Sequence, residues 1–345
     1  MQINKRFLGS SGLEITPVGF GAWAIGGGGW TYGWGPQDDK VSEETIRRAL
    51  DLGINWIDTA AVYGLGHSER VVGKLLRSLP VSERPFIFTK CGLIWDEQNP
   101  MQEPKRVLKP QSIRAECEAS LRRLGIERID LYQFHWPDET GTPIEDSWSE
   151  MLRLIEEGKV RLGGVSNFDI GLLDRCTVIR HVDSLQSPFS LIRRDVAANE
   201  IPWCETHETG LICYSPMQSG LLTDTFNAQR VASMAKDDWR RQAQEFNPPN
   251  LERNLTLRNA LQPIARRHGM SVSSVAIAWT LSWPGVTAAI VGARSPGQVD
   301  GWIDAANLQL TPADLTEIAR HIRRSGAGSG PSLPNREIAR SRDVA

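Results

Sequence analysis

Four residues whose side chains could transfer or hold a proton occur in the first half of the chain: Asp58, Tyr63, Lys90 and His135. Asp58, Lys90 and His135 each end a short apolar run, and Tyr63 lies just beyond Asp58. A free tyrosine has a pKa of about 10, which makes it a weak acid at neutral pH. A nearby ammonium group favours the phenolate and lowers that pKa, so we expect Lys90 to activate Tyr63 as a proton donor.

The other two residues could support this proton donor. Asp58 could pair with Lys90, keep the ammonium charged and fix its direction. His135 could donate a hydrogen bond to a carbonyl oxygen and orient it. The set suits protonation of a carbonyl oxygen whose carbon receives a hydride. Taken singly, each residue also has a structural interpretation, because Asp58 could cap a turn and Lys90 and His135 could simply end strands.

The elements that must position these residues follow one another in a regular order, with apolar runs alternating with amphipathic helical stretches. The expected strands cover residues 18–21, 55–58, 86–90, 129–135, 160–166, 184–187, 211–215 and 287–292. The expected helices cover residues 42–52, 68–78, 111–124, 145–157, 169–179, 199–208, 251–268 and 296–306. Eight such units predict an α/β fold, a (β/α)8 barrel of the TIM type, whose strands end on one shared face. A doubly wound open sheet is the alternative, but the first strand–helix turn carries no G-x-G-x-x-G pattern.

Four segments do not belong to these eight strand–helix units. Residues 6–16 predict a β-hairpin that turns at Ser11-Gly12 and plugs the barrel floor. Residues 216–250 form a long polar insertion that could cover the active face. Residues 271–283 predict a core-facing helix with its apolar face made by Val272, Val275, Ala276, Trp279 and Trp283. Residues 324–345 are rich in Gly, Ser, Pro and Arg and predict a flexible tail after a single domain of residues 1–323.

The composition is that of an ordinary soluble globular chain, with 23% charged and 40% hydrophobic residues in 345. A net charge of −2 does not suggest a nucleic-acid or anionic-membrane partner. Neither a signal-peptide core nor an apolar run of roughly 20 residues is seen. The five cysteines are scattered, which fits reduced thiols in the cytoplasm better than disulfides or a zinc site. No metal is expected.

Six segments in this order resemble the aldo-keto reductase superfamily: NWIDTAAVYG at 55–64, TK at 89–90, DLYQFHWPD at 130–138, GVSNF at 164–168, YSPMQSGLL at 214–222 and IVGAR at 290–294. The resemblance covers most of the chain and is strongest to the bacterial branches and the potassium-channel β-subunit relatives. It implies that Asp58, Tyr63, Lys90 and His135 form the family's catalytic tetrad. It also implies NADPH as the cofactor and a small carbonyl or sugar as the substrate.

The same resemblance implies how the cofactor is held. Ser166 and Asn167 would bind the carboxamide, with Gln186 beside them, and Tyr214 would stack on the nicotinamide. The turn at 215–222 would offer backbone amides and Ser219 to the pyrophosphate. Arg294, at the start of the last helix, would read the 2′-phosphate. The full set of expected cofactor residues is Gly21, Ala22, Trp23, Ser166, Asn167, Gln186, Tyr214, Ser215, Pro216, Met217, Gln218, Ser219, Gly220, Leu221, Gly292, Arg294 and Gln298.

The chain differs from the family pattern at one place, which concerns the binding of the adenine. The family has an acidic residue and an asparagine where this chain has Gly301 and Trp302. Trp302 could stack on the adenine or pack on the barrel. This difference weakens the expected binding of the adenine and, with it, the expected preference for NADPH.

The loop at 21–35, GAWAIGGGGWTYGWG, is rich in glycine and aromatic residues. Trp23 and Trp30 from this loop, with Trp136 after His135, are expected to form an aromatic wall around the substrate carbonyl. Loop packing is the alternative. Cys91 follows Lys90, so strand alternation predicts that its side chain points away from the tetrad into the core.

Two other functions remain open at the level of sequence. The chain could be an NAD(P)+-dependent sugar or alcohol dehydrogenase. It could also be a redox-sensing accessory subunit that binds NADPH and turns over slowly. The complete tetrad favours turnover.

Overall fold

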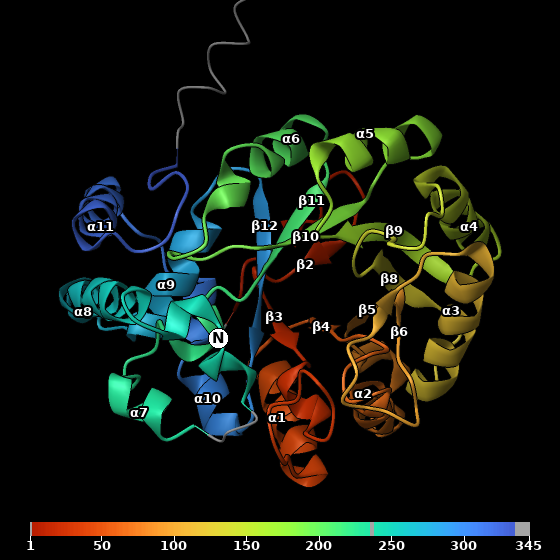
Figure 1. Cartoon of the computed structure of the whole chain (residues 1–345), viewed down its shortest axis with the longest axis horizontal. Coiled ribbons are helices and arrows are strands. Elements are labelled where there is room, and N and C mark those ends of the chain that lie inside the picture. The colour runs from red at the N-terminus through yellow and green to blue at the C-terminus, as the bar shows by residue number, and fades with distance from the viewer. Residues whose placement is uncertain (1, 235–237, 335–345) are drawn as a thin grey trace, which may run out of the picture.

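A computed structural model describes residues 2–234 and 238–334 of the chain. Eight parallel strands close into a barrel in the order β10-β11-β12-β3-β4-β5-β8-β9. In chain order these strands are β3 (Val18–Gly21), β4 (Trp56–Asp58), β5 (Phe86–Cys91), β8 (Ile129–Phe134), β9 (Val160–Ser166), β10 (Ser184–Pro188), β11 (Gly210–Tyr214) and β12 (Val286–Gly292). The predicted barrel is confirmed, and Figure 1 shows its helices arranged as a ring around the strands.

The helices occupy the intervals that amphipathic periodicity predicts. They are α1 (Asp39–Asp51), α2 (His67–Arg77), α3 (Pro110–Leu124), α4 (Ile144–Glu156), α5 (Ile170–Ile179), α6 (Glu200–Thr206), α8 (Asn250–His268), α9 (Val272–Leu281), α10 (Pro296–Asp300) and α11 (Pro312–Ser325). The helix predicted over 296–306 is wrong in one respect: α10 stops at Asp300 and a separate 3-10 turn, Ile303–Ala306, follows. Helix α11, which the sequence analysis did not predict, packs on α8.

The hairpin predicted at 6–16 consists of β1 (Arg6–Phe7) and β2 (Glu14–Ile15), paired antiparallel. Its apolar side chains pack with inward-facing strand residues at the barrel floor, in a cluster of Leu8, Leu13, Ile15, Trp56, Phe88, Leu131, Leu162, Ile212, Ala288 and Ile290. The Trp56 ring fills the space beside Gly19, where a Cβ would lie 2.1 Å from the indole. The floor of the barrel is therefore a packed apolar layer.

A polar layer lies directly above this apolar floor, because side chains two residues apart on a strand share a face. Asp58 follows Trp56 at this spacing, Lys90 follows Phe88, and Gln133 follows Leu131. All three polar residues are buried. The strands thus carry apolar side chains at one end of the barrel and ionisable or amide side chains at the other.

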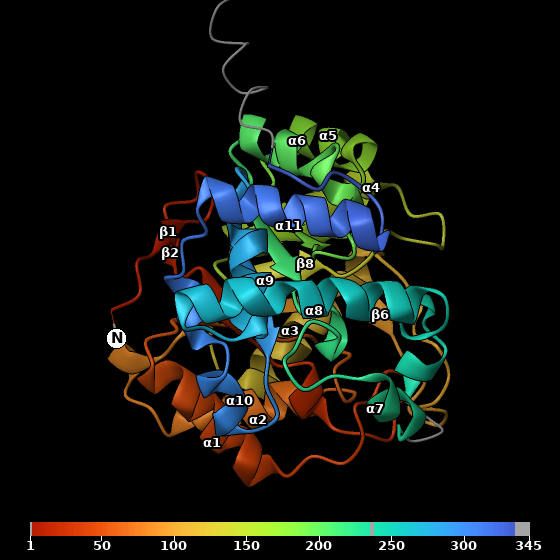
Figure 2. The ribbon, with the colours of Figure 1, turned by 90° about the vertical axis from the view of Figure 1, so that its left-hand side faces the viewer.

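Loops at the polar end contain short elements of their own. The loop after β5 holds a small antiparallel pair, β6 (Leu93–Ile94) and β7 (Lys105–Arg106), which the sequence did not reveal. The described part of the 216–250 insertion contains α7 (Ala228–Ala232) and three short 3-10 turns. Figure 2 shows β1 and β2 at one side of the molecule and α7 at the other. The insertion therefore lies over the end opposite the floor, as expected of a cover.

The packed part of the chain extends beyond residue 323, the expected domain boundary. Helix α11 continues to Ser325, and Ala327 is buried. Arg194, in the loop after β10, donates hydrogen bonds to the carbonyl oxygens of Ala327 (3.1 Å) and Gly330 (3.2 Å). The packed chain thus extends at least to Gly330, because backbone carbonyls of this segment satisfy a buried guanidinium. Residues 335–345 of the predicted tail lie outside the described residues.

No helix among the described residues is long and apolar enough to cross a bilayer. All five cysteines are buried free thiols. Cys91 packs in the core between the barrel and its helices, on the opposite side of β5 from Lys90, as strand alternation predicts. The core-facing helix predicted at 271–283 is also confirmed, since α9 is buried along its whole length.

Candidate active site

Lys90 and Asp58 form a buried ion pair at the polar end of the barrel. Lys90 Nζ lies 2.5 Å from Asp58 Oδ1 and donates a second hydrogen bond to the carbonyl oxygen of Thr59 at 2.9 Å. The two side chains are 0% and 3% exposed, so neither charge has water as an alternative partner. Burial lowers the pKa of Lys90, and the Asp58 carboxylate opposes that fall. The pair therefore fixes the direction of the ammonium, as the sequence predicts.

Tyr63 and His135 lie beside this pair. The ammonium of Lys90 is 5.2 Å from the centre of the Tyr63 ring. The His135 ring meets the Tyr63 ring edge-on, with 5.7 Å between centroids. Both side chains are only partly buried, in contrast to Lys90 and Asp58. The structure thus brings all four sequence-predicted residues together, with the two partly exposed groups on the side from which a substrate could enter.

The protonation of Tyr63 differs from the expectation. Burial raises the pKa of Tyr63 well above its usual value, and the charge on Asp58 raises it further. The expected lowering of this pKa by Lys90 is not found, because burial of the phenol has the largest effect and the neighbouring Asp58 carboxylate acts in the same direction. Tyr63 consequently keeps its proton at neutral pH, which is the state that a proton donor requires.

His135 is neutral at physiological pH. Burial, followed by the positive charges of Lys90 and Arg106, lowers the pKa of His135 well below its usual value. A neutral imidazole carries one N–H and can donate a single hydrogen bond. His135 can therefore act as a hydrogen-bond donor to an oxygen without competing with Tyr63 as an acid.

Two amide side chains extend the buried network below the tetrad. Gln186 Nε2 donates to Asp58 Oδ2 at 2.9 Å and to Gln133 Oε1 at 3.3 Å. Gln133 was not among the predicted site residues, although its position two residues before His135 placed it on the same strand face. Gln186, expected as a cofactor residue, is therefore also a hydrogen-bond partner of the Asp58 carboxylate.

The residues expected to hold the nicotinamide lie on the next strand ends. Asn167, in the left-handed conformation with φ 62°, donates to the carbonyl oxygen of His135 at 3.0 Å and accepts from the Tyr214 hydroxyl at 2.8 Å. It also donates to Ser166 Oγ at 3.0 Å. Amide and hydroxyl groups of this kind match the donors and acceptors of a carboxamide, so the residues present fit a nicotinamide ring beside Tyr63.

The turn after β11 has an unusual backbone. Ser215, Gln218 and Ser219 have positive φ values of 56°, 46° and 51°. The amides of Gln218 and Gly220 donate within the turn, to the carbonyl oxygens of Ser215 and Met217. Ser219, one of the groups that the sequence assigned to the pyrophosphate, is partly exposed. Arg240 of the insertion, which sequence reasoning missed, donates to the carbonyl oxygen of Ser219 at 3.3 Å.

Arg294, expected to read a 2′-phosphate, is bound to the loop after β3. Its Nε donates to Gln37 Oε1 at 2.8 Å and its Nη1 to the carbonyl oxygen of Trp34 at 2.9 Å. Its backbone N–H donates to Gln298 Oε1 at 2.8 Å, so Gln298 caps the turn. Trp302 is 2% exposed and packs in the core, which decides between its two expected positions. Because α10 has only five residues, a phosphate here would depend on the Arg294 side chain rather than on a helix N-terminus.

Aromatic side chains from two loops gather above Tyr63. Trp23 stacks on Tyr63 at 6.1 Å and on Trp239 of the insertion at 5.8 Å between centroids. Trp30 is buried and lies 6.5 Å from Tyr63. Trp136 instead lies under the guanidinium of Arg106, 4.4 Å away. The structure thus places Trp23 and Trp30 against Tyr63, and it adds Trp239, which no pattern in the sequence indicated.

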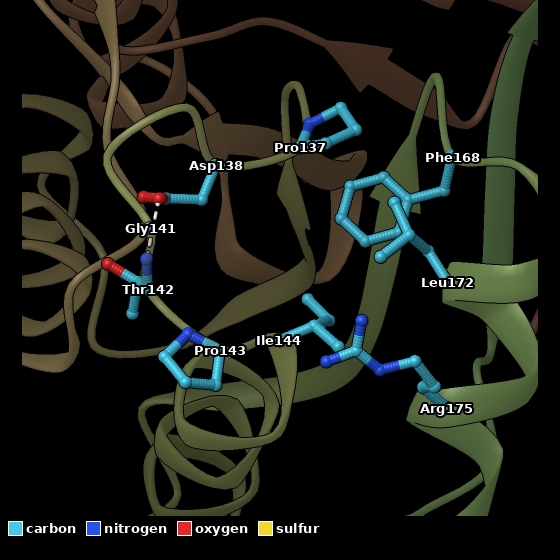
Figure 3. A pocket seen from close by; sticks show the side chains of 9 residues that line it. All are labelled: Pro137, Asp138, Gly141, Thr142, Pro143, Ile144, Phe168, Leu172 and Arg175. Carbon is cyan, nitrogen blue, oxygen red and sulfur yellow. Dashed lines mark hydrogen bonds between the residues drawn. The ribbon is translucent and has the colours of Figure 1, made fainter.

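A cavity of about 320 Å³ lies between the loops that follow β8 and β9. Its walls are formed by Pro137, Asp138, Gly141, Thr142, Pro143, Ile144, Phe168, Leu172 and Arg175, as Figure 3 shows. Its charged groups already have partners: Asp138 accepts from the amides of Thr140 and Thr142, and Arg175 pairs with Glu145 at 2.7 Å. No tetrad residue lines this cavity, and we assign it no chemistry.

Among residues 2–234 and 238–334, no cluster of three or more His, Cys, Asp or Glu side chains could hold a metal ion. The buried Lys90–Asp58 pair, with Tyr63 and His135 beside it, fits proton transfer by side chains next to a bound nicotinamide.

Comparisons with known proteins agree with this geometry. The model of the "Aldo/keto reductase family" matches residues 17–323. The chain is 35% identical to aldo-keto reductase YhdN of Bacillus subtilis over 90% of this chain and 91% of that protein. It is 32% identical to the NADH-specific methylglyoxal reductase of Escherichia coli over 93% of this chain and 100% of that protein. The solved structure of the glycerol dehydrogenase AKR11B4 from Gluconobacter oxydans superposes with a TM-score of 0.85 and 37% identity, covering 96% of this chain and 98% of that one.

The family model spans all eight strands of the barrel, and each of these relatives matches the chain over nearly its whole length. With the tetrad assembled at the carboxyl ends of the strands, the chain belongs to the aldo/keto reductase family of oxidoreductases.

Proposed function

We propose that the protein is an NADPH-dependent oxidoreductase that reduces an aldehyde or ketone to the alcohol, reversibly, with Tyr63 as the proton donor. The observation that carries the proposal is the fully buried Lys90–Asp58 pair at 2.5 Å, with the Lys90 ammonium 5.2 Å from the centre of the Tyr63 ring. The chemistry that the cofactor supplies when bound is a hydride, delivered to the carbonyl carbon. The residues of this chain must then orient the carbonyl and protonate its oxygen.

Each tetrad residue has a defined task in this proposal. His135 donates a hydrogen bond to the carbonyl oxygen and holds it beside the Tyr63 hydroxyl. The Tyr63 hydroxyl would give its proton to this oxygen as negative charge develops on it. The Lys90 ammonium, held by Asp58, stabilises the phenolate that remains. In the reverse direction the Tyr63 phenolate accepts the proton of the alcohol.

The cofactor would lie across the polar end of the barrel. Ser166, Asn167 and Gln186 would hold the carboxamide, and Tyr214 would pack against the ring. Ser219 would face the pyrophosphate and Arg294 the 2′-phosphate. Preference for NADPH rests on Arg294 alone among these groups, and a relative is named NADH-specific. NADH is therefore the alternative cofactor that the experiment must include.

Oxidation of a small polyol is the second candidate activity. It is favoured by the likeness to a glycerol dehydrogenase structure at 37% identity over 96% of the chain. Both directions use the same four residues, so the site geometry does not separate them.

Initial rates on the purified chain test the proposal. NADPH and NADH oxidation would be followed with methylglyoxal and a panel of other aldehydes and ketones, and NADP+ and NAD+ reduction with glycerol. We expect carbonyl-dependent NADPH oxidation with a higher kcat/KM than with NADH. Turnover with NADH only would overturn the cofactor assignment. Cofactor binding without turnover of any carbonyl or alcohol would favour an accessory subunit instead.

A further inference from the structure

The guanidinium of Arg294 ties the end of the barrel to the loop that follows β3. Its Nε donates to Gln37 Oε1 (2.8 Å), its Nη1 to the carbonyl oxygen of Trp34 (2.9 Å) and its Nη2 to that of Pro36 (2.5 Å). Gln37 returns a hydrogen bond from Nε2 to the Arg294 carbonyl oxygen at 3.1 Å. Four hydrogen bonds thus join two segments that are about 260 residues apart in the chain.

The loop held in this way carries the aromatic wall of the active site. The Trp34 ring meets Trp23 edge-on, with 5.4 Å between centroids, and Trp23 stacks on Tyr63. On its other side Trp34 contacts the guanidinium of Arg240, 4.8 Å away, and the Trp239 ring at 6.0 Å. An unbroken series of contacts therefore runs from Arg294 through Trp34 and Trp23 to Tyr63.

Arg294 can hold this loop and still bind an anion. A guanidinium carries five N–H donors in a planar fork, and the loop uses three of them. Two N–H groups remain for a phosphate. Because the loop contacts fix the plane of the guanidinium, they also fix the direction in which those two donors point.

We propose that Arg294 is a positioning residue for the aromatic wall, acting through the carbonyl oxygens of Trp34 and Pro36 and through Gln37. The inference rests on the proposed function and goes beyond it: Arg294 sets affinity for the carbonyl substrate even with a cofactor that has no 2′-phosphate. Loss of Arg294 releases residues 34–37, loosens Trp34 and Trp23, and weakens substrate binding next to Tyr63.

The test uses Arg294→Ala and Gln37→Ala with NADH as the cofactor, because NADH cannot report on phosphate recognition. We expect KM for the carbonyl to rise about 3- to 10-fold in Arg294→Ala, which corresponds to about 0.7–1.4 kcal/mol, the net contribution of one ordinary hydrogen bond. Gln37→Ala should show a smaller rise, and kcat should change less than KM in both variants. Arg294→Lys keeps a positive charge but cannot span three acceptors. It should therefore raise the carbonyl KM as Arg294→Ala does.

Arg48→Ala is the matched control. Arg48 on α1 pairs with Asp300 on α10 at 2.7 Å, so it joins the same two parts of the molecule without touching the aromatic loop. The carbonyl KM of this variant should equal that of the wild type. A rise in KM for NADPH alone, with carbonyl KM unchanged under NADH, would show that Arg294 serves only the cofactor and would overturn the inference.

A second readout does not depend on turnover. In the cofactor-free protein, the Trp34 amide donates to the carbonyl oxygen of Gly27 at 3.3 Å and should be protected from hydrogen exchange. Exchange in residues 27–37 should be faster in Arg294→Ala and Gln37→Ala than in Arg48→Ala. Equal exchange in all three variants would contradict the positioning role. If the wild type proved to reduce no carbonyl, the proposed function would fail while this measurement still decided the role of Arg294.

Discussion

At the scale of single residues, the buried groups that carry charge are distinct from the partly exposed groups that can donate a proton or a hydrogen bond. The Lys90–Asp58 pair is sealed from solvent, whereas Tyr63 and His135 are partly exposed. Burial raises the pKa of Tyr63 and lowers the pKa of His135, so the phenol holds its proton and the imidazole stays neutral. The residues proposed to contact the substrate are thus kept in their donating forms, while the buried Lys90–Asp58 pair lies beside them.

Tyr63→Phe removes the hydroxyl and leaves the ring that stacks on Trp23. We expect carbonyl reduction to fall at least about 100-fold, because general acid catalysis contributes about 10²–10⁴-fold. Cofactor affinity, measured by fluorescence titration with NADPH and NADH, should persist. Since the pKa of Tyr63 is raised, wild-type kcat/KM for reduction should not decline between about pH 6 and about pH 9. A variant retaining more than about a tenth of wild-type turnover would remove Tyr63 from its assigned role.

Lys90 and Asp58 should behave as one unit. Lys90→Met removes the ammonium and leaves Asp58 buried without its partner. Asp58→Asn leaves Lys90 buried without a counter-charge, so the pKa of Lys90 should fall further. Because both changes disable the same support of Tyr63, the double variant should be little slower than the worse single variant. The measurement is single-turnover hydride transfer at saturating cofactor. If the two losses multiply, the residues act independently and the mechanism argued for the tetrad is wrong.

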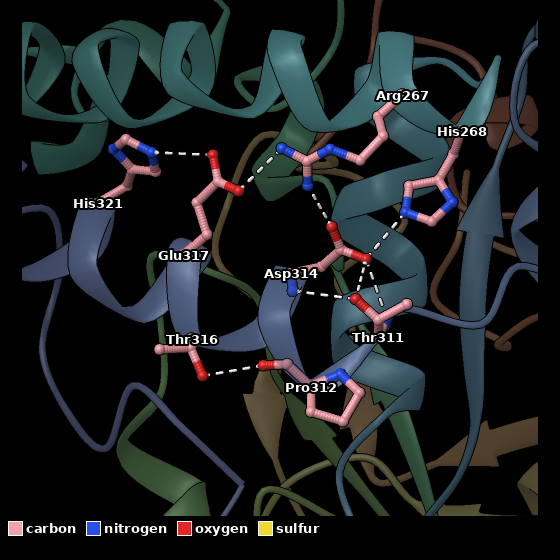
Figure 4. A network of polar contacts seen from close by, with 8 residues as sticks. All are labelled: Arg267, His268, Thr311, Pro312, Asp314, Thr316, Glu317 and His321. Carbon is pink, nitrogen blue, oxygen red and sulfur yellow. Dashed lines mark hydrogen bonds and ion pairs between the residues drawn. The ribbon is translucent and has the colours of Figure 1, made fainter.

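At the scale of elements, the last two long helices are joined by a polar network on the outside of the barrel (Figure 4). Asp314, near the start of α11, accepts hydrogen bonds from Thr311 in its own capping box and from Arg267 and His268 at the end of α8. Although burial alone would raise its pKa, these hydrogen bonds lower the pKa of Asp314 to about 2. The ionised carboxylate therefore stabilises the packing of α11 on α8.

The coupling between proton binding and folding gives a pH-dependent prediction for Asp314→Asn. A carboxyl whose pKa is lower in the folded than in the unfolded state stabilises the fold above about pH 4, and this contribution is lost as the pH falls through about 2. The variant should lower the free energy of unfolding by about 1–3 kcal/mol near neutral pH. In urea titrations at a series of pH values, the gap between wild type and variant should close toward pH 2.

The control for this prediction lies on the same helix. Thr316 is exposed and its hydroxyl donates only to the carbonyl oxygen of Pro312, at 2.8 Å. Thr316→Ala should change stability by less than about 0.5 kcal/mol at every pH. A stability gap for Asp314→Asn that stayed constant with pH would mean that the charge of Asp314 does not carry the effect.

At the scale of the whole molecule, the segment that follows the barrel packs back against a loop of the barrel. After α11 the segment 326–330 runs against the loop that follows β10, where Ser329 pairs with Arg193 in a β-bridge. Gly328 has a φ of +62°, and a Cβ on it would lie 1.6 Å from the carbonyl oxygen of Ile192. Gly326 has nearly the same φ, +66°, but its nearest neighbours are 3.9 Å away on the Arg253 side chain.

These two glycines form a matched pair that tests the docking of the segment. Gly326→Ala should cost only the left-handed backbone penalty of about 1–2 kcal/mol. Gly328→Ala pays the same penalty and must also displace the segment from Ile192, which should add about 1–3 kcal/mol. Free energies of unfolding from urea titrations would measure both. Equal losses would show that residues 326–330 contribute nothing to the stability of the barrel.

The barrel and the position of the tetrad could be predicted from patterns in the sequence. The eight strands could be predicted because period-2 and period-3.6 patterns are local properties. Asp58, Lys90 and His135 could be placed on one face because parallel barrel strands all end on the same side. The family motifs supplied Tyr63 and the candidate cofactor residues. Gln133 was within reach of the same reasoning, since it shares the strand face of His135.

What those residues contact follows from the folded structure. The pKa of Tyr63 depends on burial and on the position of the Asp58 carboxylate, and neither is a property of the local sequence. The contact of Trp239 with Trp23 and of Arg294 with Trp34 joins segments more than 200 residues apart. Such contacts depend on where the folded backbone carries each loop, and a glycine-rich or polar loop has no periodicity from which that path could be predicted. For this reason the sequence identified which residues could do the chemistry, and only the fold showed which loops hold them in place.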